Sequence, residues 1–539
     1  MGVTMSNHIV IGFFGAALGA WASISGAPTA RAQEWGDEIV LLESPGIPSY
    51  VGLSNGGIAV TPDRTIHVVW TEQDAELEGS LRHQVYTAEV VDNAVSTAAH
   101  VIVPYLDSYP GRPDTGAKWP TLATDPEGGL HLAWHDYRIG EIWNVEIYYK
   151  QRPPVTEWDP SPSADLRLTT TDHPEWNGDN GYLPTIRRSP LGELRVVWFD
   201  MRFYPEEAEI MSKATLPEGG WDTTPGDSAD ERLTENPANS EFPDLVFDPE
   251  GAAHVVYAEN SNDIYGIYYT WLPAGEAEWS LPQRITPDSV VARSPSLAPS
   301  PDGSILCVWE DGRDGAARVY AALLDSAGGS WGEAEPVSPI GVGVSGPAAA
   351  ASPDGIFHIV WSDRRLGFFD DVVWCQHGRG GDWDPSGAAD ERVSTGTRAT
   401  DPEITGSWDG RVIVSWRDKS EDSSADIWMR IRSAGPTEVA DSPRATPARS
   451  RFGNPHPNPF NPRVILPVEL SFEGFVRVEI HDISGRRVRR LLREHLESGT
   501  HRLLWDGRND AGRPLPSGPY IARLISAETE ARTTLVLLK

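Results

Sequence analysis

The sequence predicts an all-β protein: a seven-bladed β-propeller, whose last blade is closed by an N-terminal strand, followed by a small C-terminal Ig-like β-sandwich. The first observation is that the hairpin pattern of residues 121–138 occurs seven times along the chain. The second is that one strand of each hairpin is apolar on both faces, which places it between packed sheets. The third is composition, since 51 Gly, 45 Pro and 21 Trp favour short strands and many turns.

Each copy of the hairpin contains a tight turn of the Asp/Ser-Pro-Asp/Glu-Gly type and then an apolar strand that ends near one large aromatic residue. These anchor aromatics align the copies at a nearly constant spacing. They are Trp70, Trp134, Trp198, Tyr257, Trp309, Trp361 and Trp416.

A third and a fourth strand complete each unit. The third strand is expected in segments such as 146–150, 266–271, 318–323, 371–376 and 426–431. The fourth is marked by an Arg-Leu/Ile/Val-Thr/Ser pattern that begins at Arg167, Arg232, Arg284 and Arg392. Four strands per unit, repeated around an axis, are typical of a propeller because the blades bury both faces of each sheet.

The two ends of the repeat region indicate how the ring closes. The seventh copy lacks a fourth strand, and residues 38–44 precede the first copy where other copies carry that strand. We therefore expect this N-terminal segment to complete the last blade and cover its edge. The alternative is an open or six-bladed arrangement with one irregular copy.

Residues 1–32 are expected to be a signal peptide. An apolar run at 9–27 precedes Ala30-Arg31-Ala32, whose small residues suit cleavage after Ala32, although the region before the run contains no Lys or Arg. The alternative is a membrane anchor, because the run approaches the length of a spanning helix. After cleavage we expect no transmembrane segment and a location outside the cytoplasm, secreted or at the cell surface.

The remaining chain divides into a propeller at 33–432, a Pro/Ser/Ala-rich linker at 433–456 and a small domain at 457–539. The last region resembles the FlgD-type Ig-like module, also known as a type IX secretion C-terminal sorting domain, over residues 454–539. The resemblance is carried by the motifs at 458–462, 482–488, 505–507 and 517–520. It implies export or surface attachment in a Gram-negative-type envelope, with the type IX secretion machinery as a partner.

Charge and cysteine content restrict the partners. With 45 Lys+Arg against 78 Asp+Glu, the net charge of −33 argues against nucleic acid, which requires a basic surface. We expect a monomer without a cofactor. Two cysteines cannot form a disulfide scaffold. Packing explains Cys307, and a bond between Cys307 and Cys375 is left open.

Repeated polar residues follow the anchor aromatics in a Trp-x-Asp-x-Arg pattern. It includes the candidate ligand residues Asp136, Arg138, Asp200 and Arg202. A ligand has no sevenfold symmetry, whereas turns and ion pairs recur in every blade, so the repetition favours a scaffold role. Histidines before the anchors lie in separate blades and cannot converge on a metal, so we expect no metal site. They are His67, His131, His254 and His358.

Departures from the repeat are a better guide to a binding site. The connections at 105–119 and 171–182 and the loop at 203–209 are enlarged. We expect them to form one sector of the rim, where aromatic rings beside carboxylates suit sugar recognition. The alternative is solvated loops with incidental aromatics. The candidate residues are Asp114, Lys118, Trp119, Trp176, Asp179 and Tyr204.

These features favour a secreted or cell-surface binding protein that recognises a glycan or a surface protein through its rim. The repeats also resemble the sialidase superfamily, which implies a glycoside hydrolase as the alternative. Against it, the sequence has no strict Ser-x-Asp-x-Gly-x-x-Trp box and no Arg-Ile-Pro motif near the start of the ring. A lyase or a calcium-stabilised polysaccharide binder is a third option. Catalytic status, catalytic residues and the ligand stay open.

Overall fold

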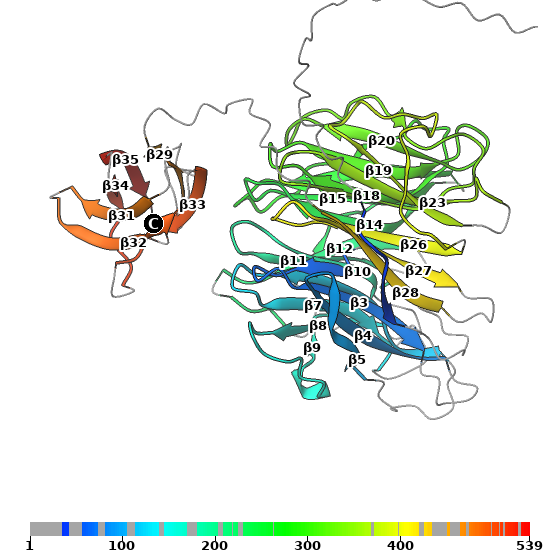
Figure 1. Ribbon diagram of the computed structural model, residues 1–539, viewed down its shortest axis with the longest axis horizontal. Coiled ribbons are helices and arrows are strands. Elements are labelled where there is room, and N and C mark those ends of the chain that lie inside the picture. Colours follow the sequence, from blue (N-terminus) through cyan, green and yellow to red (C-terminus); the bar gives the residue numbers. More distant parts are fainter. Residues whose placement is uncertain are drawn as a thin grey trace, which may run out of the picture.

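The protein consists of four-stranded blades arranged around an axis and a separate group of C-terminal strands (Figure 1). In this computed structural model, the only helix among the described residues is a 3-10 turn at Pro162–Ala164. The described residues are 35–42, 56–73, 81–104, 114–138, 145–169, 181–202, 208–217, 219–224, 230–261, 264–367, 371–396, 398–419, 425–433, 450–452, 464–470, 474–483, 485–496, 499–505, 507–509, 513–525 and 530–538.

Seven blades are present, as the repeats predict. In six of them the strands pair antiparallel in chain order, and the seventh takes its fourth strand from the N-terminal segment. The first blade comprises β2 (Ile58–Val60), β3 (Ile66–Gln73), β4 (Leu81–Val91) and β5 (Ala94–Val103), and the second β6 (Asp114–Thr124), β7 (Leu130–Asp136), β8 (Glu146–Arg152) and β9 (Leu166–Arg167). The third comprises β10 (Gly181–Arg188), β11 (Leu194–Asp200), β12 (Glu209–Ala214) and β13 (Glu231–Arg232), and the fourth β14 (Asn239–Phe247), β15 (Ala253–Ser261), β16 (Ile264–Leu272) and β17 (Gln283–Arg284).

The later blades repeat this plan. The fifth comprises β18 (Ala292–Pro299), β19 (Ile305–Asp311), β20 (Arg318–Leu324) and β21 (Glu335–Pro336), and the sixth β22 (Ser345–Ala351), β23 (Phe357–Asp363), β24 (Val372–Gly378) and β25 (Glu391–Arg392). The seventh comprises β26 (Ala399–Gly406), β27 (Val412–Lys419), β28 (Ala425–Arg432) and the N-terminal β1 (Ile39–Leu42).

Strand β1 closes the ring. It pairs antiparallel with β28, with Ile39 opposite Met429. Leu41 is 5% exposed and belongs to the same buried cluster as Ile413 and Ile427 of the last blade. Just before the strand, Trp35 Nε1 donates to Glu391 Oε2 of the sixth blade at 3.0 Å. The predicted closure by the N-terminal segment is confirmed, and the open and six-bladed alternatives are excluded.

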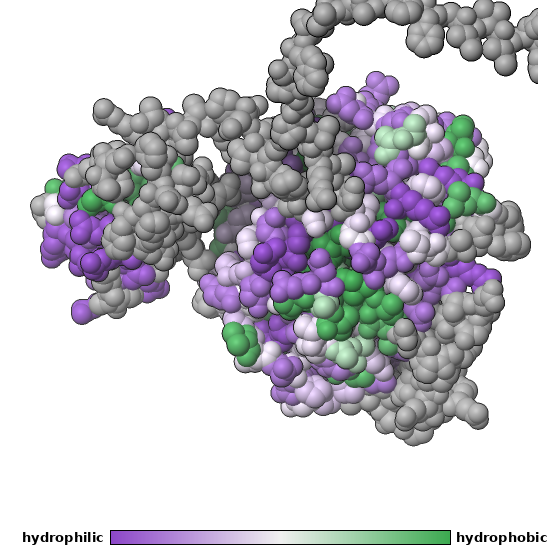
Figure 2. Space-filling view, viewed as in Figure 1, coloured by the Kyte–Doolittle hydropathy of each residue, from purple (hydrophilic) through white to green (hydrophobic). Residues whose placement is uncertain are grey.

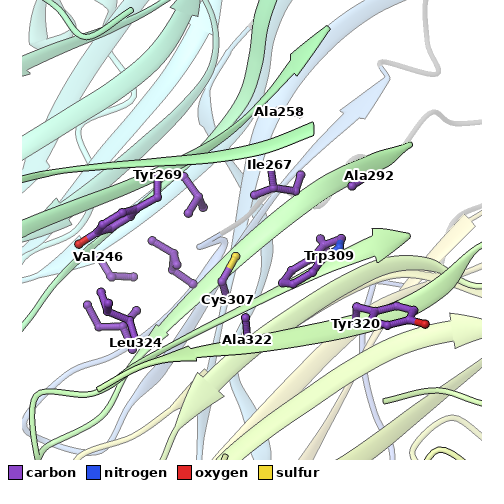
Figure 3. Packing of buried hydrophobic residues seen from close by; sticks show 13 residues of the cluster. Val246, Ala258, Ile267, Tyr269, Ala292, Cys307, Trp309, Tyr320, Ala322 and Leu324 are labelled. Carbon is purple, nitrogen blue, oxygen red and sulfur yellow. The ribbon is translucent and has the colours of Figure 1, made fainter. Parts of the chain in front are cut away.

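The core lies between neighbouring blades. All seven anchor aromatics are buried, because the strand that carries each one packs against sheets on both sides. Figure 3 shows one such layer, in which Val246 and Ile267 of the fourth blade pack near Cys307 and Trp309 of the fifth. Cys307 and Cys375 are both buried and both free, so they are not bonded.

The first two blades are joined in a way that the repeat does not predict. The start of β4 pairs parallel with the start of β6, which places His83 opposite Gly116. Gly116 has φ +115°, and a Cβ atom there would lie 2.2 Å from the carbonyl oxygen of His83. The absence of a side chain at Gly116 therefore permits this close approach. The beginning of β6 comes from the connection at 105–119, of which residues 105–113 lie outside the described residues.

The C-terminal strands form two sheets. One contains β29 (Arg451–Phe452), β30 (Val464–Leu470) and β33 (Gly499–Trp505), and the other β31 (Gly474–Asp482), β32 (Arg487–Leu496), β34 (Gly518–Ile525) and β35 (Glu530–Leu537). Buried Trp505 and Tyr520 pack edge to face between them, and the Tyr520 hydroxyl donates to the Pro516 carbonyl at 2.8 Å. β29 falls inside the segment 433–456 that the sequence assigned to a linker.

The face of the molecule seen in Figure 2 is largely hydrophilic. Its largest group of hydrophobic residues lies in the middle of the propeller, with smaller spots elsewhere. Within the described ranges, no helix has the length and apolar character needed to cross a membrane. The expected signal peptide at 1–32 lies outside those ranges.

Candidate ligand site at the propeller axis

A ring of strained residues surrounds one end of the axis. In six blades the innermost strand contains a residue with positive φ directly before a proline, and the pairing with the second strand shifts register there. These residues are Trp119, Leu183, Phe242, Ser294, Gly346 and Asp401, with φ between 49° and 58°. We call them the bulge ring. In the first blade Gly56, with φ +87°, stands at the proline position.

Local chemistry explains why the bulges form. Proline has no N–H to offer a neighbouring strand, so inside a sheet it is tolerated at a bulge. The free N–H of the residue before it is satisfied by the preceding blade: Trp119 N donates to Thr71 Oγ1 at 3.1 Å and Gly346 N to Glu310 Oε1 at 2.9 Å. A non-glycine residue with positive φ costs about 1–3 kcal/mol, and such strain concentrates at functional sites.

The bulge ring lines a cavity of about 230 Å³. Thr185, Glu403 and five of the six prolines, all except Pro120, complete its wall. The ring is symmetric in backbone but not in side chain. Trp119, Leu183 and Phe242 from three consecutive blades form an apolar arc, whereas Ser294, Gly346 and Asp401 form a small and polar one. The backbone of the ring repeats from blade to blade, but its side chains differ between the two arcs. A single ligand has no sevenfold symmetry, so a site for it needs such a difference.

A polar network lies next to the cavity, on the side of the second half of the innermost strands. The N–H of Gly56 donates to Glu403 Oε2 at 3.1 Å. Arg187 Nη1 donates to Thr121 Oγ1 at 3.4 Å, and its Nη2 lies 3.6 Å from Asp244 Oδ1. The other carboxylate oxygen of Asp244 accepts a hydrogen bond from the backbone of the next blade. Six blades, all but the sixth, therefore contribute groups to this network.

Two carboxyl groups of this network are perturbed by burial. Burial raises the pKa of Glu403 well above its usual range; the Gly56 N–H and Arg187 oppose the shift, while Asp244 and Asp401 reinforce it. Burial also raises the pKa of Asp244, against the opposing effects of Arg187 and of backbone N–H groups. Asp401 forms an ion pair with Arg417 at 2.6 Å, and its side chain is 46% exposed.

A second cavity, of about 350 Å³, lies at the opposite end of the innermost strands of blades one, two, three and seven. Its charged lining residues are Arg187 and Arg188, and Trp408 stands at its edge with 57% of its surface exposed. Arg187 thus lies between the two cavities, where it contacts the network that contains Glu403.

The Trp-x-Asp-x-Arg residues form the same buried unit in four blades. Trp198 Nε1 donates to Asp200 Oδ2 at 2.7 Å, and Arg202 pairs with that oxygen at 2.6 Å and with Asp230 at 3.0 Å. Asp136 with Arg138, Asp311 with Arg313 and Asp363 with Arg365 follow the same plan. The aspartates are at most 2% exposed. These contacts support the scaffold interpretation of Asp136, Arg138, Asp200 and Arg202.

The residues of the expected rim sector are only partly described. Trp119 lines the axial cavity, and Lys118 lies 5.2 Å from the centre of the Tyr137 ring. Tyr137 in turn contacts Tyr182 edge to face. The structure thus places Lys118 beside the Tyr137 and Tyr182 rings. Asp114 begins β6, and Trp176, Asp179 and Tyr204 lie outside the described residues.

Sequence reasoning missed Arg187, Asp244, Asp401 and Glu403. These residues could have been found from positions where the sequence departs from the repeat. Aligned on the anchor aromatics, the innermost strands carry Gly57, Thr121, Thr185, Asp244, Ser296, Ala348 and Glu403 at one register, and Ala59, Ala123, Arg187, Val246, Ala298, Ala350 and Thr405 at another. Charged residues at registers otherwise filled by small or apolar ones mark the site.

The histidines before the anchor residues have hydrogen-bond partners within their own blades. His131 Nδ1 lies 2.7 Å from the Tyr149 hydroxyl, and His254 Nδ1 lies 2.7 Å from that of Tyr269. His358 Nδ1 contacts His377 Nδ1 at 2.6 Å. Among the residues that the structure describes, no group of three His, Cys, Asp or Glu side chains is arranged to hold a metal ion.

The fold and the axial cavity define a propeller protein with an asymmetric candidate ligand site, joined to a second β domain. Residues 470–529 of that second domain match the FlgD Ig-like domain family. The expected FlgD-type resemblance is confirmed for this segment. No curated protein sequence matches the chain.

Several solved structures are similar to this chain at low sequence identity. A protein of unknown function from Dyadobacter fermentans is 14% identical, with 59% of this chain and 94% of that chain covered and a TM-score of 0.42. An ulvan lyase is 12% identical, with coverages of 71% and 93% and a TM-score of 0.48. An α-L-arabinanase from Penicillium chrysogenum, complexed with arabinobiose, is 12% identical, with coverages of 74% and 98% and a TM-score of 0.39.

Proposed function

We propose that this protein is an exported binding protein that recognises a glycan in the axial cavity and at the rim above it. The observation that carries the proposal is the asymmetry of the bulge ring. Trp119 and Phe242 provide an apolar wall, and Ser294, Asp401 and Glu403 provide hydrogen-bonding groups on the other side. A surface protein that presents an aromatic or sugar-like group is the alternative partner.

Sugar chemistry suits this arrangement. Sugar rings have one face of C–H groups that packs on aromatic rings, and hydroxyls that exchange hydrogen bonds with carboxyl and hydroxyl groups. A cavity of about 230 Å³ is smaller than the roughly 300–1,000 Å³ of sites for drug-sized ligands, so it suits one ring of a longer glycan. The rest of that glycan would extend over the rim, toward Lys118 and Tyr137.

Export is the second part of the proposal. The Ala30-Arg31-Ala32 site supports removal of residues 1–32, and the FlgD Ig-like match supports a sorting role for the C-terminal domain. We infer the type IX secretion machinery as the export partner and a Gram-negative-type cell surface or its surroundings as the destination. Mass spectrometry of the exported protein tests the first step, with Gln33 expected as the new N-terminus.

The alternative function from the sequence is a sialidase-like glycoside hydrolase. The repeated carboxylates Asp136 and Asp200 do not favour it, because each is buried and bound by an indole N–H and an arginine. A carboxylate held in this way is poorly placed to reach a substrate.

A glycan array with residues 33–539 tests the binding proposal. The variant Trp119→Gly removes the indole while allowing the positive φ of that residue. Val155→Gly is the matched control, because Val155 also has positive φ (60°) but is fully exposed and does not line the cavity. We expect the wild type and the control to bind glycan, and Trp119→Gly to lose at least about tenfold in affinity. The size of this loss follows from nucleobase recognition, where stacking on an aromatic side chain contributes on the order of 1–3 kcal/mol. Equal affinity of all three proteins would contradict the proposal.

A further inference from the structure

We propose that the axial cavity also hydrolyses glycosidic bonds, with Glu403 as the proton-donating acid and Asp401 as the base that activates water. This inference rests on the proposed glycan site and adds an activity to it. It assigns that activity to residues of the seventh blade rather than to the repeated Trp-x-Asp-x-Arg aspartates.

The two side chains line the same cavity from the same strand. Asp401 and Glu403 lie on β26, on either side of Pro402 at the bulge, and all three residues contribute to the cavity wall. Trp119, Leu183 and Phe242, from blades two to four, line the same cavity. A sugar ring held against that apolar arc would share the cavity with both carboxyl groups.

The surroundings of the two carboxyl groups differ in the way that acid–base chemistry requires. Asp401 is partly exposed and forms an ion pair with Arg417 at 2.6 Å. Glu403 is 6% exposed. The groups that act on it are the N–H of Gly56, the guanidinium of Arg187 and the carboxylates of Asp244 and Asp401.

Burial outweighs the favourable contacts of Glu403, so its pKa is raised and its neutral form persists to higher pH than that of an ordinary glutamate. Glycoside hydrolysis uses two carboxyl groups, one of which has a raised pKa and donates a proton. Arg187 and Gly56 act as positioning residues, because they touch Glu403 or its network and not the cavity occupant.

The reaction balances with water as the second substrate. The Glu403 carboxyl transfers its proton to the glycosidic oxygen as the bond from that oxygen to the anomeric carbon breaks, and the leaving group departs as an alcohol. A water molecule adds its oxygen to the anomeric carbon and gives a proton to the Asp401 carboxylate. One proton has then moved from Glu403 to Asp401, and exchange with solvent restores both groups.

The test combines turnover and binding in the same proteins. Aryl glycosides and the glycans retained on the array are incubated with wild type, Glu403→Gln, Asp401→Asn and the control Asp288→Asn, whose side chain is 95% exposed. We expect Glu403→Gln to lose about 10²- to 10⁴-fold in turnover of natural glycans, since that is the usual contribution of a general acid. Glycan affinity is expected to stay within about threefold, because glutamine keeps a neutral side chain and an oxygen that can accept the Gly56 N–H.

The outcomes separate this inference from the binding proposal. Glycan binding by the wild type without any turnover overturns the catalytic inference and leaves the binding proposal intact. Turnover that survives in both Glu403→Gln and Asp401→Asn overturns the residue assignment. Circular dichroism and denaturant unfolding of each variant identify any loss of turnover that comes from misfolding. If Glu403→Gln misfolds, Glu403→Asp supplies a second test, because it shortens the acid and keeps its chemistry. Its turnover should fall while its glycan binding persists.

Discussion

The backbone N–H of Gly56, at the start of the first blade, donates a hydrogen bond to Oε2 of Glu403 in the seventh blade at 3.1 Å. The two residues are 347 positions apart in the chain. The same glycine leaves room for Arg187, since a Cβ atom on residue 56 would lie 2.3 Å from Nη1 of that guanidinium. One glycine thus links the closure of the ring to the polar network next to the cavity.

Replacing Gly56 by alanine should therefore be unusually costly. The new Cβ would crowd Arg187 and Thr121, and φ +87° is unfavourable for any L side chain. Gly315→Ala is the matched control, because Gly315 has φ +84° and a Cβ there meets nothing within 4 Å. We expect Gly315→Ala to lose about 1 kcal/mol in the free energy of unfolding and Gly56→Ala about 1–3 kcal/mol more, measured by chemical denaturation. Equal losses would show that the Arg187 guanidinium can move away from residue 56 without a cost in stability.

The buried Trp-Asp-Arg unit should contribute to stability and not to ligand binding. Asp200→Asn removes the charge that pairs with Arg202 and leaves that arginine, whose side chain is 1% exposed, beside Asp230. Breaking a buried ion pair on one side costs about 3–5 kcal/mol, so the free energy of unfolding should fall by that order. Glycan affinity of the folded variant should be unchanged. A variant that kept its stability but lost glycan affinity would instead make Asp200 a ligand residue.

Much of the propeller could be predicted because the same buried contacts between strands recur in every blade. Each anchor aromatic, such as Trp134 or Trp361, is fully buried between blades, and the same apolar strand must recur wherever a blade recurs. The closing strand could also be predicted, since the last copy lacked a partner that residues 38–44 could supply. In structure that partner is β1, which pairs with β28.

The pairing of β4 with β6 and the candidate site could not be predicted in this way, because they depend on single residues that break the repeat. The parallel pairing of β4 with β6 relies on the missing side chain of Gly116, and a lone glycine in a strand is equally compatible with a bulge or a tight bend. Glu403 and Arg187 come from registers that carry no charge in most other blades, so no periodic pattern points to them. Trp119 was found because its loop is enlarged. Leu183 follows the enlarged connection at 171–182 but was not singled out, because it is an ordinary apolar residue at the start of a strand, and Phe242 lies on an ordinary connection.

Acid should destabilise the propeller through its buried histidines. Burial lowers the pKa of His358 to about 2, with nearby His377 and Arg432 acting in the same direction. The unfolded chain binds a proton at this position below about pH 6.5 and the folded chain does not, so stability is lost as the pH falls through that value. His358 alone should lower the free energy of unfolding by about 2 kcal/mol between pH 7 and pH 5. Urea unfolding across this range should show a shallower pH dependence for His358→Gln; the same slope in both proteins would contradict the buried, neutral state.

Thiol titration checks the state of the two cysteines. Cys307 and Cys375 are free and fully buried, and burial raises the pKa of both thiols. A thiol-specific reagent should therefore react with neither residue in the native protein and with both after unfolding without a reductant. No reaction after unfolding would mean that the two cysteines are bonded.

The most direct test of the axial site is a structure of the protein with a glycan selected from the array. We expect one sugar ring in the cavity enclosed by the bulge ring, packed against Trp119 and hydrogen-bonded to Asp401 or Glu403. A ring found instead in the cavity beside Arg188 and Trp408, or on the outer face of the blades, would contradict the assignment of the ligand site.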